Sequence, residues 1–213
     1  MQNNPLENLA NAFERLPGIG PRQARRFVHF LLSQNESSRI HLADCIRNLG
    51  STTASCPQCF RWFVRNNNDV YVETKNQLCN VCSSPKRDHR ILFVLEKDAD
   101  IDNVERGGFR GLYFVLGGTA PLAEENPERF IRIDDLLIRI EDYGNKKILS
   151  EIILGLSATT EGDHTRILLQ EILREPTERY GIKITALGRG LSTGSELEYA
   201  DPDTIASALS TRR

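Results

Sequence analysis

Two CxxC pairs constrain this chain more than any other feature of its sequence. Cys56 and Cys59 form the first pair, Cys79 and Cys82 form the second, and 19 residues lie between the pairs. Each pair can present two thiolates to a metal ion, and two pairs complete a tetrahedral shell of four sulfurs. Four protein ligands leave no position open for a substrate, so we expect one structural zinc ion per chain instead of a catalytic metal. The alternative is a group of four buried cysteines without a metal.

The segment between the two pairs has little regular apolar spacing but contains aromatic and β-branched residues, among them Trp62, Phe63 and Tyr71. We expect a small hairpin there, with its turn at residues 66–69. The fifth cysteine, Cys45, lies in a stretch that mixes apolar and polar residues. It is expected to be a buried helix residue and not a reactive thiol.

The composition is that of an ordinary globular protein. Of 213 residues, 39% are hydrophobic and 26% are charged, which suits one or two hydrophobic cores. No run approaches the roughly 18 consecutive apolar residues of a membrane span, and the first residues lack the pattern of a signal peptide. We therefore expect a cytoplasmic protein with no membrane partner. In that reducing compartment, paired cysteines favour metal binding over disulfides.

Charge is distributed unevenly along the chain. Residues 1–90 contain 12 Lys and Arg against 7 Asp and Glu, a net charge of +5, whereas residues 91–213 contain 15 against 22, a net charge of −7. Electrostatic attraction is local at physiological salt, so the basic half can contact phosphates although the whole chain carries a net charge of −2.

Residues 6–16 and 21–32 repeat apolar residues at intervals of three or four, which predicts two amphipathic helices. The connecting segment Pro17–Pro21 resembles a helix-hairpin-helix element, in which a glycine turn exposes backbone N–H groups to a phosphate. The three arginines that follow have the i, i+3, i+4 spacing of one helix face. The residues expected to contact DNA are Gly18, Gly20, Arg22, Arg25 and Arg26. The alternative is an αα-hairpin whose basic face is only solvated.

From residue 91 onward, short apolar runs alternate with helical patterns. The expected strands are Ile91–Leu95, Leu112–Leu116, Glu151–Leu156 and Ile182–Ala186, and the expected helices lie at 133–143 and 164–174. This alternation predicts βαβ units and a parallel sheet with flanking helices. We therefore expect an α/β fold that is preceded by small α-helical and zinc-finger modules.

Acidic residues follow two of the expected strands. Glu96 ends the first strand, and Glu161 and Asp163 follow the third, so all three are expected at the carboxyl edge of the sheet, where such folds place their sites. The region resembles a Toprim domain, the metal-binding fold of primases and topoisomerases. Active Toprim enzymes carry an Asp-x-Asp pair before the Glu-Gly, but here Ser157 and Thr159 occupy those positions. The magnesium cage that the resemblance implies thus lacks two carboxylates.

The order of these features resembles the RecR family of bacterial recombination proteins over essentially the whole chain. The strings LPGIGPRQARRF, CNVC followed by SSPKRD, FVLGG and GRGLSTGSELEYAD carry the resemblance. It implies four regions: a helix-hairpin-helix DNA-binding region at 1–54, a four-cysteine zinc finger at 55–89, a Toprim domain at 90–186, and a Walker B-like and oligomerisation segment at 187–213.

Two features depart from the family pattern. The interval between the cysteine pairs is longer than the family's, which implies an enlarged hairpin, and Ser192 and Ser195 stand where a proline and a glycine are expected. The first departure concerns the contacts of the zinc finger. The second concerns any Walker B-like role of the carboxyl-terminal segment, which also lacks the phosphate-cradling GKS or GKT loop of nucleotide-binding proteins.

The resemblance implies a recombination mediator in DNA repair, not an enzyme. RecR proteins assemble as rings, commonly homotetramers, that clamp single- and double-stranded DNA without sequence preference and act with RecO and RecF to load RecA at gaps. In this chain, Glu96, Glu161 and Asp163 are expected to form an acidic surface for a basic partner such as RecO. One alternative is a metal-dependent Toprim nuclease or primase-like enzyme that uses the same three acids. Another is a zinc-dependent protein-interaction module with little affinity for DNA.

Overall fold

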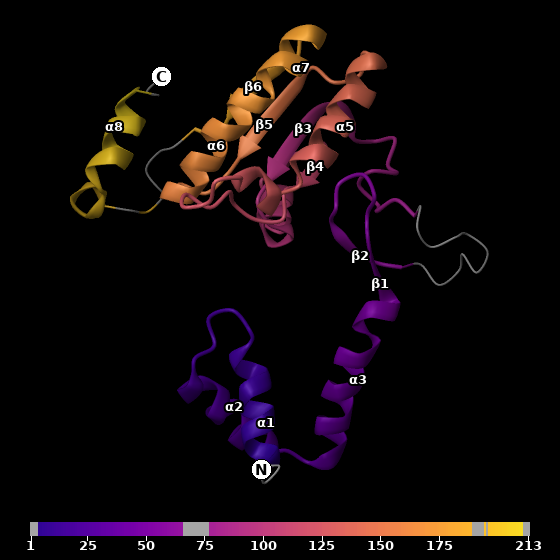
Figure 1. Cartoon of the computed structure of the whole chain (residues 1–213), viewed down its shortest axis with the longest axis vertical. Helices are drawn as coiled ribbons and strands as arrows, with labels where there is room; N and C mark the ends of the chain where they lie inside the picture. Colours follow the sequence, from indigo (N-terminus) through magenta and orange to yellow (C-terminus); the bar gives the residue numbers. More distant parts are fainter. Residues whose placement is uncertain (1–3, 66–76, 189–193, 195, 211–213) are drawn as a thin grey trace. The chain divides into compact units, whose positions relative to one another are not determined.

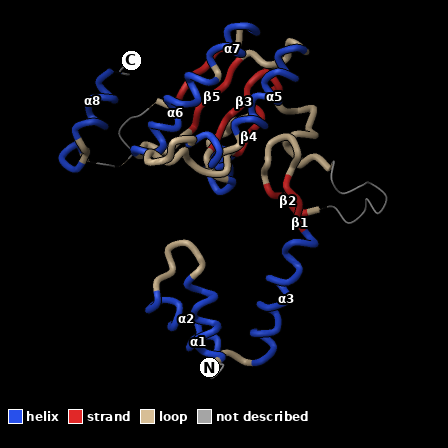
Figure 2. The backbone as a smooth tube through the Cα atoms, in the orientation of Figure 1, coloured by secondary structure: helices blue, strands red, loops and turns tan. Residues whose placement is uncertain are grey.

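The computed structural model describes residues 4–65, 77–188, 194 and 196–210, and it divides into two compact units, Met1–Thr53 and Ala54–Arg213 (Figure 1). The first unit is helical, and the second combines helices with strands, as the colours of Figure 2 distinguish. None of the described helices has the length and apolar character needed to span a membrane.

The first unit contains α1 (Pro5–Glu14), α2 (Pro21–Ser33) and α3 (Glu36–Thr52). A proline begins each of the first two helices, where its missing N–H costs no hydrogen bond. The Asn4 side chain caps α1 by accepting a hydrogen bond from the N–H of Leu6 at 3.1 Å. The two helices predicted at 6–16 and 21–32 are therefore confirmed to within two residues.

A small core joins α1 to α2. Ala10 on α1 and Ala24 and Val28 on α2 are buried against one another. The rings of Phe13 and Phe27 meet edge to face, with their centroids 5.7 Å apart. The two alanines let the backbones approach closely, so the hairpin is held by few side chains.

Helix α3 has no buried residue in the part of the first unit that the structure describes. Ile46 is 65% exposed and Leu49 is 63% exposed. Cys45 is exposed as well, so the prediction that it is a buried helix residue was wrong. The pattern identified a helix with apolar residues correctly, but burial also requires an element that covers them, and the described part of this unit supplies none.

The second unit is built on a four-stranded parallel sheet of β3 (Asp88–Leu95), β4 (Gly111–Val115), β5 (Glu151–Gly155) and β6 (Lys183–Ala186). The strand order is β4-β3-β5-β6. Phe93, in the central part of the sheet, pairs with Tyr113 on one side and with Ile153 on the other. The four expected strands and the parallel sheet are confirmed.

Four helices connect these strands: α4 (Ile101–Arg106), α5 (Ile133–Asn145), α6 (Thr160–Ile172) and α7 (Arg174–Tyr180). Helix α8 (Pro202–Ser210) follows the last strand. Short 3₁₀ helices lie at Asp98–Asp100, Pro127–Phe130 and Leu197–Tyr199. The single helix expected at 164–174 begins earlier and gives way to α7, because Pro176 lacks an N–H and its ring would clash with the carbonyl of Ile172. Helices α5 and α7 lie side by side (Figure 1).

The cysteine module packs directly on the sheet. It contains a two-stranded sheet of β1 (Thr53–Ser55) and β2 (Trp62–Val64), and the turn expected at residues 66–69 lies outside the described residues. The N–H of Val115 donates to the carbonyl of Cys59 at 2.9 Å. The ring of Phe60 meets that of Phe114 edge to face, with their centroids 5.4 Å apart. Module and sheet therefore share one hydrophobic core.

Candidate metal centre and nucleic-acid interface

The four paired cysteines converge on one point. Their sulfur atoms all lie within 4.8 Å of one another, and the Sγ atoms of Cys59 and Cys79 are 3.6 Å apart. A tetrahedron with metal–sulfur bonds of about 2.3 Å has edges of about 3.8 Å, so the cluster has the size of a four-thiolate metal site. Among the described residues, no other group of three or more His, Cys, Asp and Glu side chains is placed to hold a metal ion.

Local backbone geometry aims the sulfur atoms inward. The N–H of Phe60 donates to the carbonyl of Cys56 at 2.8 Å, and the N–H of Ser83 donates to the carbonyl of Cys79 at 3.0 Å, so each pair sits on a tight turn. The N–H of Cys82 points at the Sγ of Cys79 at 3.5 Å. Phe60 has a φ of 60°, in the left-handed region that non-glycine residues seldom adopt. The first turn thus accepts backbone strain to bring its two sulfurs together.

The four thiols are close enough to shift one another's pKa in opposite directions. The pKa of Cys56 is lowered because the thiols of Cys59, Cys79 and Cys82 donate hydrogen bonds to its thiolate. The pKa of Cys59 is raised, first because its proton is held by Cys56 and also because it is buried. Without a cation the group therefore keeps protons, whereas a divalent metal would let all four sulfurs ionise. The cysteines are placed to bind a metal ion, as their spacing predicted.

The candidate nucleic-acid interface is the turn between α1 and α2. Gly18 has a φ of 77°, which L side chains rarely adopt, and Gly20 is the N-cap of α2. No side chain caps this helix end, so N–H groups of its first turn are available to a phosphate. Arg22, Arg25 and Arg26 are all exposed on α2. In the described part of the chain none of the three forms an ion pair.

The three acidic residues lie near the carboxyl edge of the sheet, but they differ in environment. Glu96 is only 6% exposed, and its Oε1 accepts a hydrogen bond from the N–H of Ser157 at 2.6 Å. Glu161 is exposed in the first turn of α6. Asp163 pairs with Arg166 at 3.3 Å. The expectation of a shared acidic surface therefore changes for Glu96, whose carboxylate faces the β5–α6 loop and not the solvent.

Hydroxyl groups stand where a Toprim enzyme would carry carboxylates. The Oγ of Ser157 and the Oγ1 of Thr159 are 2.9 Å apart, and Thr159 caps α6 by accepting from the N–H of Gly162 at 3.1 Å. A Cβ on Gly162 would lie 2.1 Å from the carbonyl oxygen of Ser157, so only glycine fits there. Hydrogen bonds between residues of the loop and the first turn of α6 therefore hold this segment together.

The structure also reveals residues that the sequence interpretation missed. Arg132 donates from Nη1 to the carbonyl of Val115 at 3.0 Å, and its guanidinium lies 5.1 Å from the ring centroid of Phe60, so it links the cysteine module to the sheet. Arg139 is buried in α5. One signal could have identified it: Arg139 is a lone charge on the apolar face of the expected helix 133–143, between Leu136 and Tyr143.

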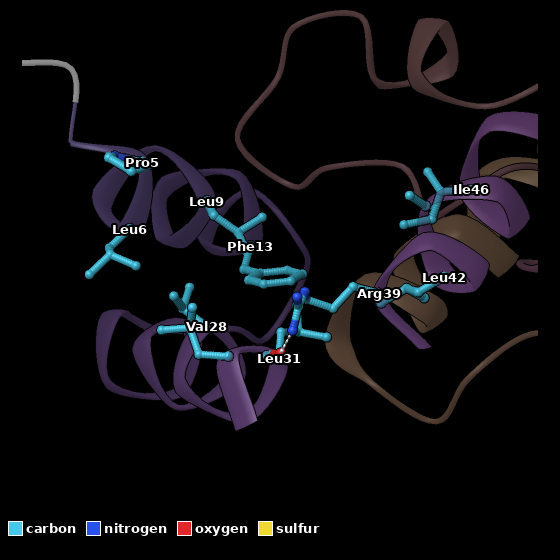
Figure 3. Close-up of a pocket in the computed structure, with 11 residues that line it drawn as sticks. Pro5, Leu6, Leu9, Phe13, Val28, Leu31, Arg39, Leu42 and Ile46 are labelled. Carbon is cyan, nitrogen blue, oxygen red and sulfur yellow. Dashed lines mark hydrogen bonds between the residues drawn. The ribbon is translucent and has the colours of Figure 1, made fainter. Parts of the chain in front are cut away.

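An apolar groove of about 440 Å³ lies within the first unit (Figure 3). Leu6, Leu9 and Phe13 of α1 line it, together with Val28 and Leu31 of α2 and with Leu42 and Ile46 of α3. Arg39 bridges the end of α2, donating to the carbonyls of Leu31 and Gln34. The groove leaves apolar side chains of all three helices open to another molecule.

Comparisons with known proteins agree with this arrangement. Residues 6–49 match the family model "RecR, helix-hairpin-helix", residues 90–187 match "Toprim domain", and residues 190–213 match "RecR, C-terminal". Among curated proteins, the chain is similar to the "Recombination protein RecR" of Roseiflexus sp. (strain RS-1), with 36% identity over 211 residues, 98% of this chain and 93% of that protein. Proteins of the same name from Roseiflexus castenholzii (37% identity, 98% and 93%) and from Bifidobacterium longum subsp. infantis (36%, 98% and 95%) are also similar.

The cysteine cluster yields a direct prediction on metal content. We expect one metal ion per chain, and we expect Cys56→Ser and Cys79→Ser each to lose the ion and to unfold the second unit, because metal binding energy becomes folding energy at such a site. Native mass spectrometry gives the stoichiometry, and circular dichroism gives the folding. The matched control is Cys45→Ser, which removes an exposed thiol and should keep both metal and fold. A wild-type chain without metal, purified without chelator, would contradict the site.

Proposed function

The chain belongs to the RecR family of recombination proteins, and on this premise we propose that it is a recombination mediator that clamps DNA and acts with RecO and RecF to promote loading of RecA at gapped DNA. The observation that carries the proposal is the α1–α2 turn, which joins an uncapped helix start to three exposed arginines. Such a site binds the DNA backbone, as a clamp that must act at any sequence requires.

The proposed DNA contacts are those of a non-specific binder. Backbone N–H groups in the first turn of α2, after Pro21, hold one phosphate, and the guanidinium groups of Arg22, Arg25 and Arg26 hold neighbouring ones. None of these contacts reads a base edge. The proposed binding is therefore independent of sequence, applies to single- and double-stranded DNA, and depends strongly on salt.

We propose that the metal of the cysteine cluster is zinc and that its role is structural. Four thiolates favour zinc among the common divalent ions, and the closed shell leaves no position for water or substrate. Cys56 and Cys59 come from one turn and Cys79 and Cys82 from the other, so the ion would fasten the two ends of the module to each other. Elemental analysis of the protein used for mass spectrometry identifies the ion.

We propose that the Toprim domain of this chain binds a partner and does not catalyse phosphoryl transfer. Ser157 and Thr159 offer neutral hydroxyls that bond each other, whereas phosphoryl transfer needs clustered carboxylates that fix divalent ions. Exposed Glu161 is the proposed contact for a basic partner such as RecO, together with Asp163. Buried Glu96 supports that surface indirectly, because it holds the loop that leads into α6.

We propose that copies of the chain associate through the first unit, as part of a homotetrameric ring. The apolar groove and the uncovered side chains of α3, among them Ile46 and Leu49, support this. A second copy supplies matching apolar surface from the same helices, which is the usual basis of a symmetric interface. We further assign the region boundaries 1–54, 55–89, 90–186 and 187–213 and a cytoplasmic location as parts of the proposal.

DNA binding tests the first part. Arg22→Ala and Arg25→Ala should each weaken binding to unrelated DNA sequences to a similar extent and lower the slope of log K against log salt concentration by about one unit. Fluorescence anisotropy titrations at several salt concentrations measure both quantities. Arg47→Ala is the control, because it removes the same charge from an exposed residue of α3 that is paired with Asp44. Equal losses in all three variants, or in none, would contradict the assigned contacts.

Activity assays test the Toprim assignment. We expect no cleavage, relaxation or primer synthesis on single-stranded, nicked or supercoiled DNA with Mg²⁺ or Mn²⁺. An activity that disappears in Glu96→Gln, which keeps an oxygen for the Ser157 N–H but removes the charge, would favour the Toprim enzyme instead. Glu161→Ala should leave folding, metal content and DNA binding unchanged and should weaken association with RecO. Glu171→Ala, an exposed position further along α6, is the matched control.

Solution mass tests self-association. Ile46→Asp places a charge among the apolar side chains of α3 and should reduce the assembly to smaller species, as measured by light scattering at several concentrations. Ile167→Asp, which alters an exposed position of α6, should leave the mass unchanged. A wild-type chain that is monomeric with and without DNA would refute the ring.

A further inference from the structure

Arg139 is a buried cation without an evident counter-charge. The residue lies on α5 and is 6% exposed. Its three side-chain nitrogens are inaccessible and have no hydrogen-bond acceptor among the described residues. A buried guanidinium without a partner is strongly destabilising, so buried charges in folded proteins are as a rule compensated by hydrogen-bond acceptors or by opposite charge.

The residues around Arg139 show which part of the chain lies next to its charge. A cavity of about 200 Å³ separates α5 from the first cysteine turn, and its lining includes Pro57 and Gln58 from that turn and Arg139 and Tyr143 from the helix. Pro57 and Gln58 are the two residues between the ligands Cys56 and Cys59. Arg139 therefore faces the metal module from the apolar face of α5.

Carboxylates close to Arg139 do not supply the missing charge. Asp135 and Asp142 line the same cavity, but both are exposed. Asp142 pairs with Lys146 at 2.7 Å. In the described part of the chain, neither carboxylate lies within ion-pair distance of Arg139.

The ring of Tyr143 compensates the charge of Arg139 only in part. It lies 5.0 Å from the guanidinium carbon of Arg139, as in a cation–π contact. A ring contacts the face of the guanidinium, whereas the N–H groups lie in its plane and point elsewhere. Those donors still need an acceptor.

The metal cluster carries the complementary charge. Four thiolates around a divalent ion have a net charge of −2, and the cysteines are buried, between 0% and 5% exposed. Arg139 lies on the side of α5 next to the cluster, because it lines one cavity with Pro57 and Gln58, the two residues between Cys56 and Cys59. A buried dianion and a buried cation on adjoining elements stabilise each other.

We propose that Arg139 is the counter-ion of the tetrathiolate metal centre, a positioning residue that neutralises half of its excess negative charge and fastens it to helix α5. The role rests on the proposed zinc centre. Arg139 acts through the thiolates and does not touch the metal, in the way that groups around a metal's ligands tune its affinity. Arg139 thus adds a charge contact to the backbone and ring contacts that already join the module to the Toprim domain.

The test compares the zinc affinity of the full-length chain with that of two variants, using competition with a chromogenic chelator. Arg139→Met keeps length and apolar volume but removes the charge, and it should weaken zinc binding about 10- to 100-fold. Arg139→Lys keeps the charge and should lose less than about tenfold. Arg179→Met is the control, because Arg179 also lies over a tyrosine ring, that of Tyr180, but pairs with Glu175 on the surface.

The outcomes separate this proposal from the zinc centre itself. Wild-type protein without metal overturns both. Wild-type protein with one zinc per chain and an Arg139→Met variant of equal affinity overturns only the role of Arg139. If Arg139→Lys binds zinc as weakly as Arg139→Met does, the shape of the side chain matters and not its charge. That result also overturns the proposed role of Arg139. If Arg139→Met does not fold, Arg139→Lys decides alone: a loss above about tenfold overturns the proposal and a smaller loss supports it.

Discussion

The second unit depends on four buried cysteine sulfurs that have to lie close to one another. Cys56 and Cys82 lie on turns far apart in the sequence, and thiols held this closely cannot all ionise without a cation between them. The cluster does more than close a loop, because the carbonyl of Cys59 accepts a hydrogen bond from the edge strand at Val115. The metal site is therefore joined to the sheet by a backbone hydrogen bond as well as by side-chain contacts.

At the carboxyl edge of the sheet, an acidic side chain makes a structural contact. Glu96 directly follows β3, and its carboxylate accepts a hydrogen bond from the N–H of Ser157. A buried carboxylate that accepts a backbone N–H stabilises the loop much as a metal ligand would stabilise a cage. A glutamate at this edge of the Toprim domain thus supports the β5–α6 loop, in a chain whose relatives are named for recombination.

Much of this structure could be predicted from local sequence patterns, and the exceptions have physical reasons. Apolar spacing located the strand at 91–95, and paired cysteines located the metal site, because both signals lie within a few adjacent residues. The burial of Glu96, the exposure of Cys45 and the unpaired charge of Arg139 depend on which distant element lies alongside. A single sequence does not encode such neighbours locally, so an interpretation from residue types alone placed Glu96 on the surface and Cys45 in a core.

The tight loop between β5 and α6 restricts the charge that its positions can carry. Ser157 and Thr159 share a hydrogen bond, and Gly162 packs against the Ser157 carbonyl with no room for a Cβ. An aspartate at one position could still accept a hydrogen bond from the remaining hydroxyl, whereas aspartates at both would repel each other until a cation arrived. The pair of hydroxyls thus keeps these two positions neutral, and the loop would come to depend on a cation only when both had become acidic.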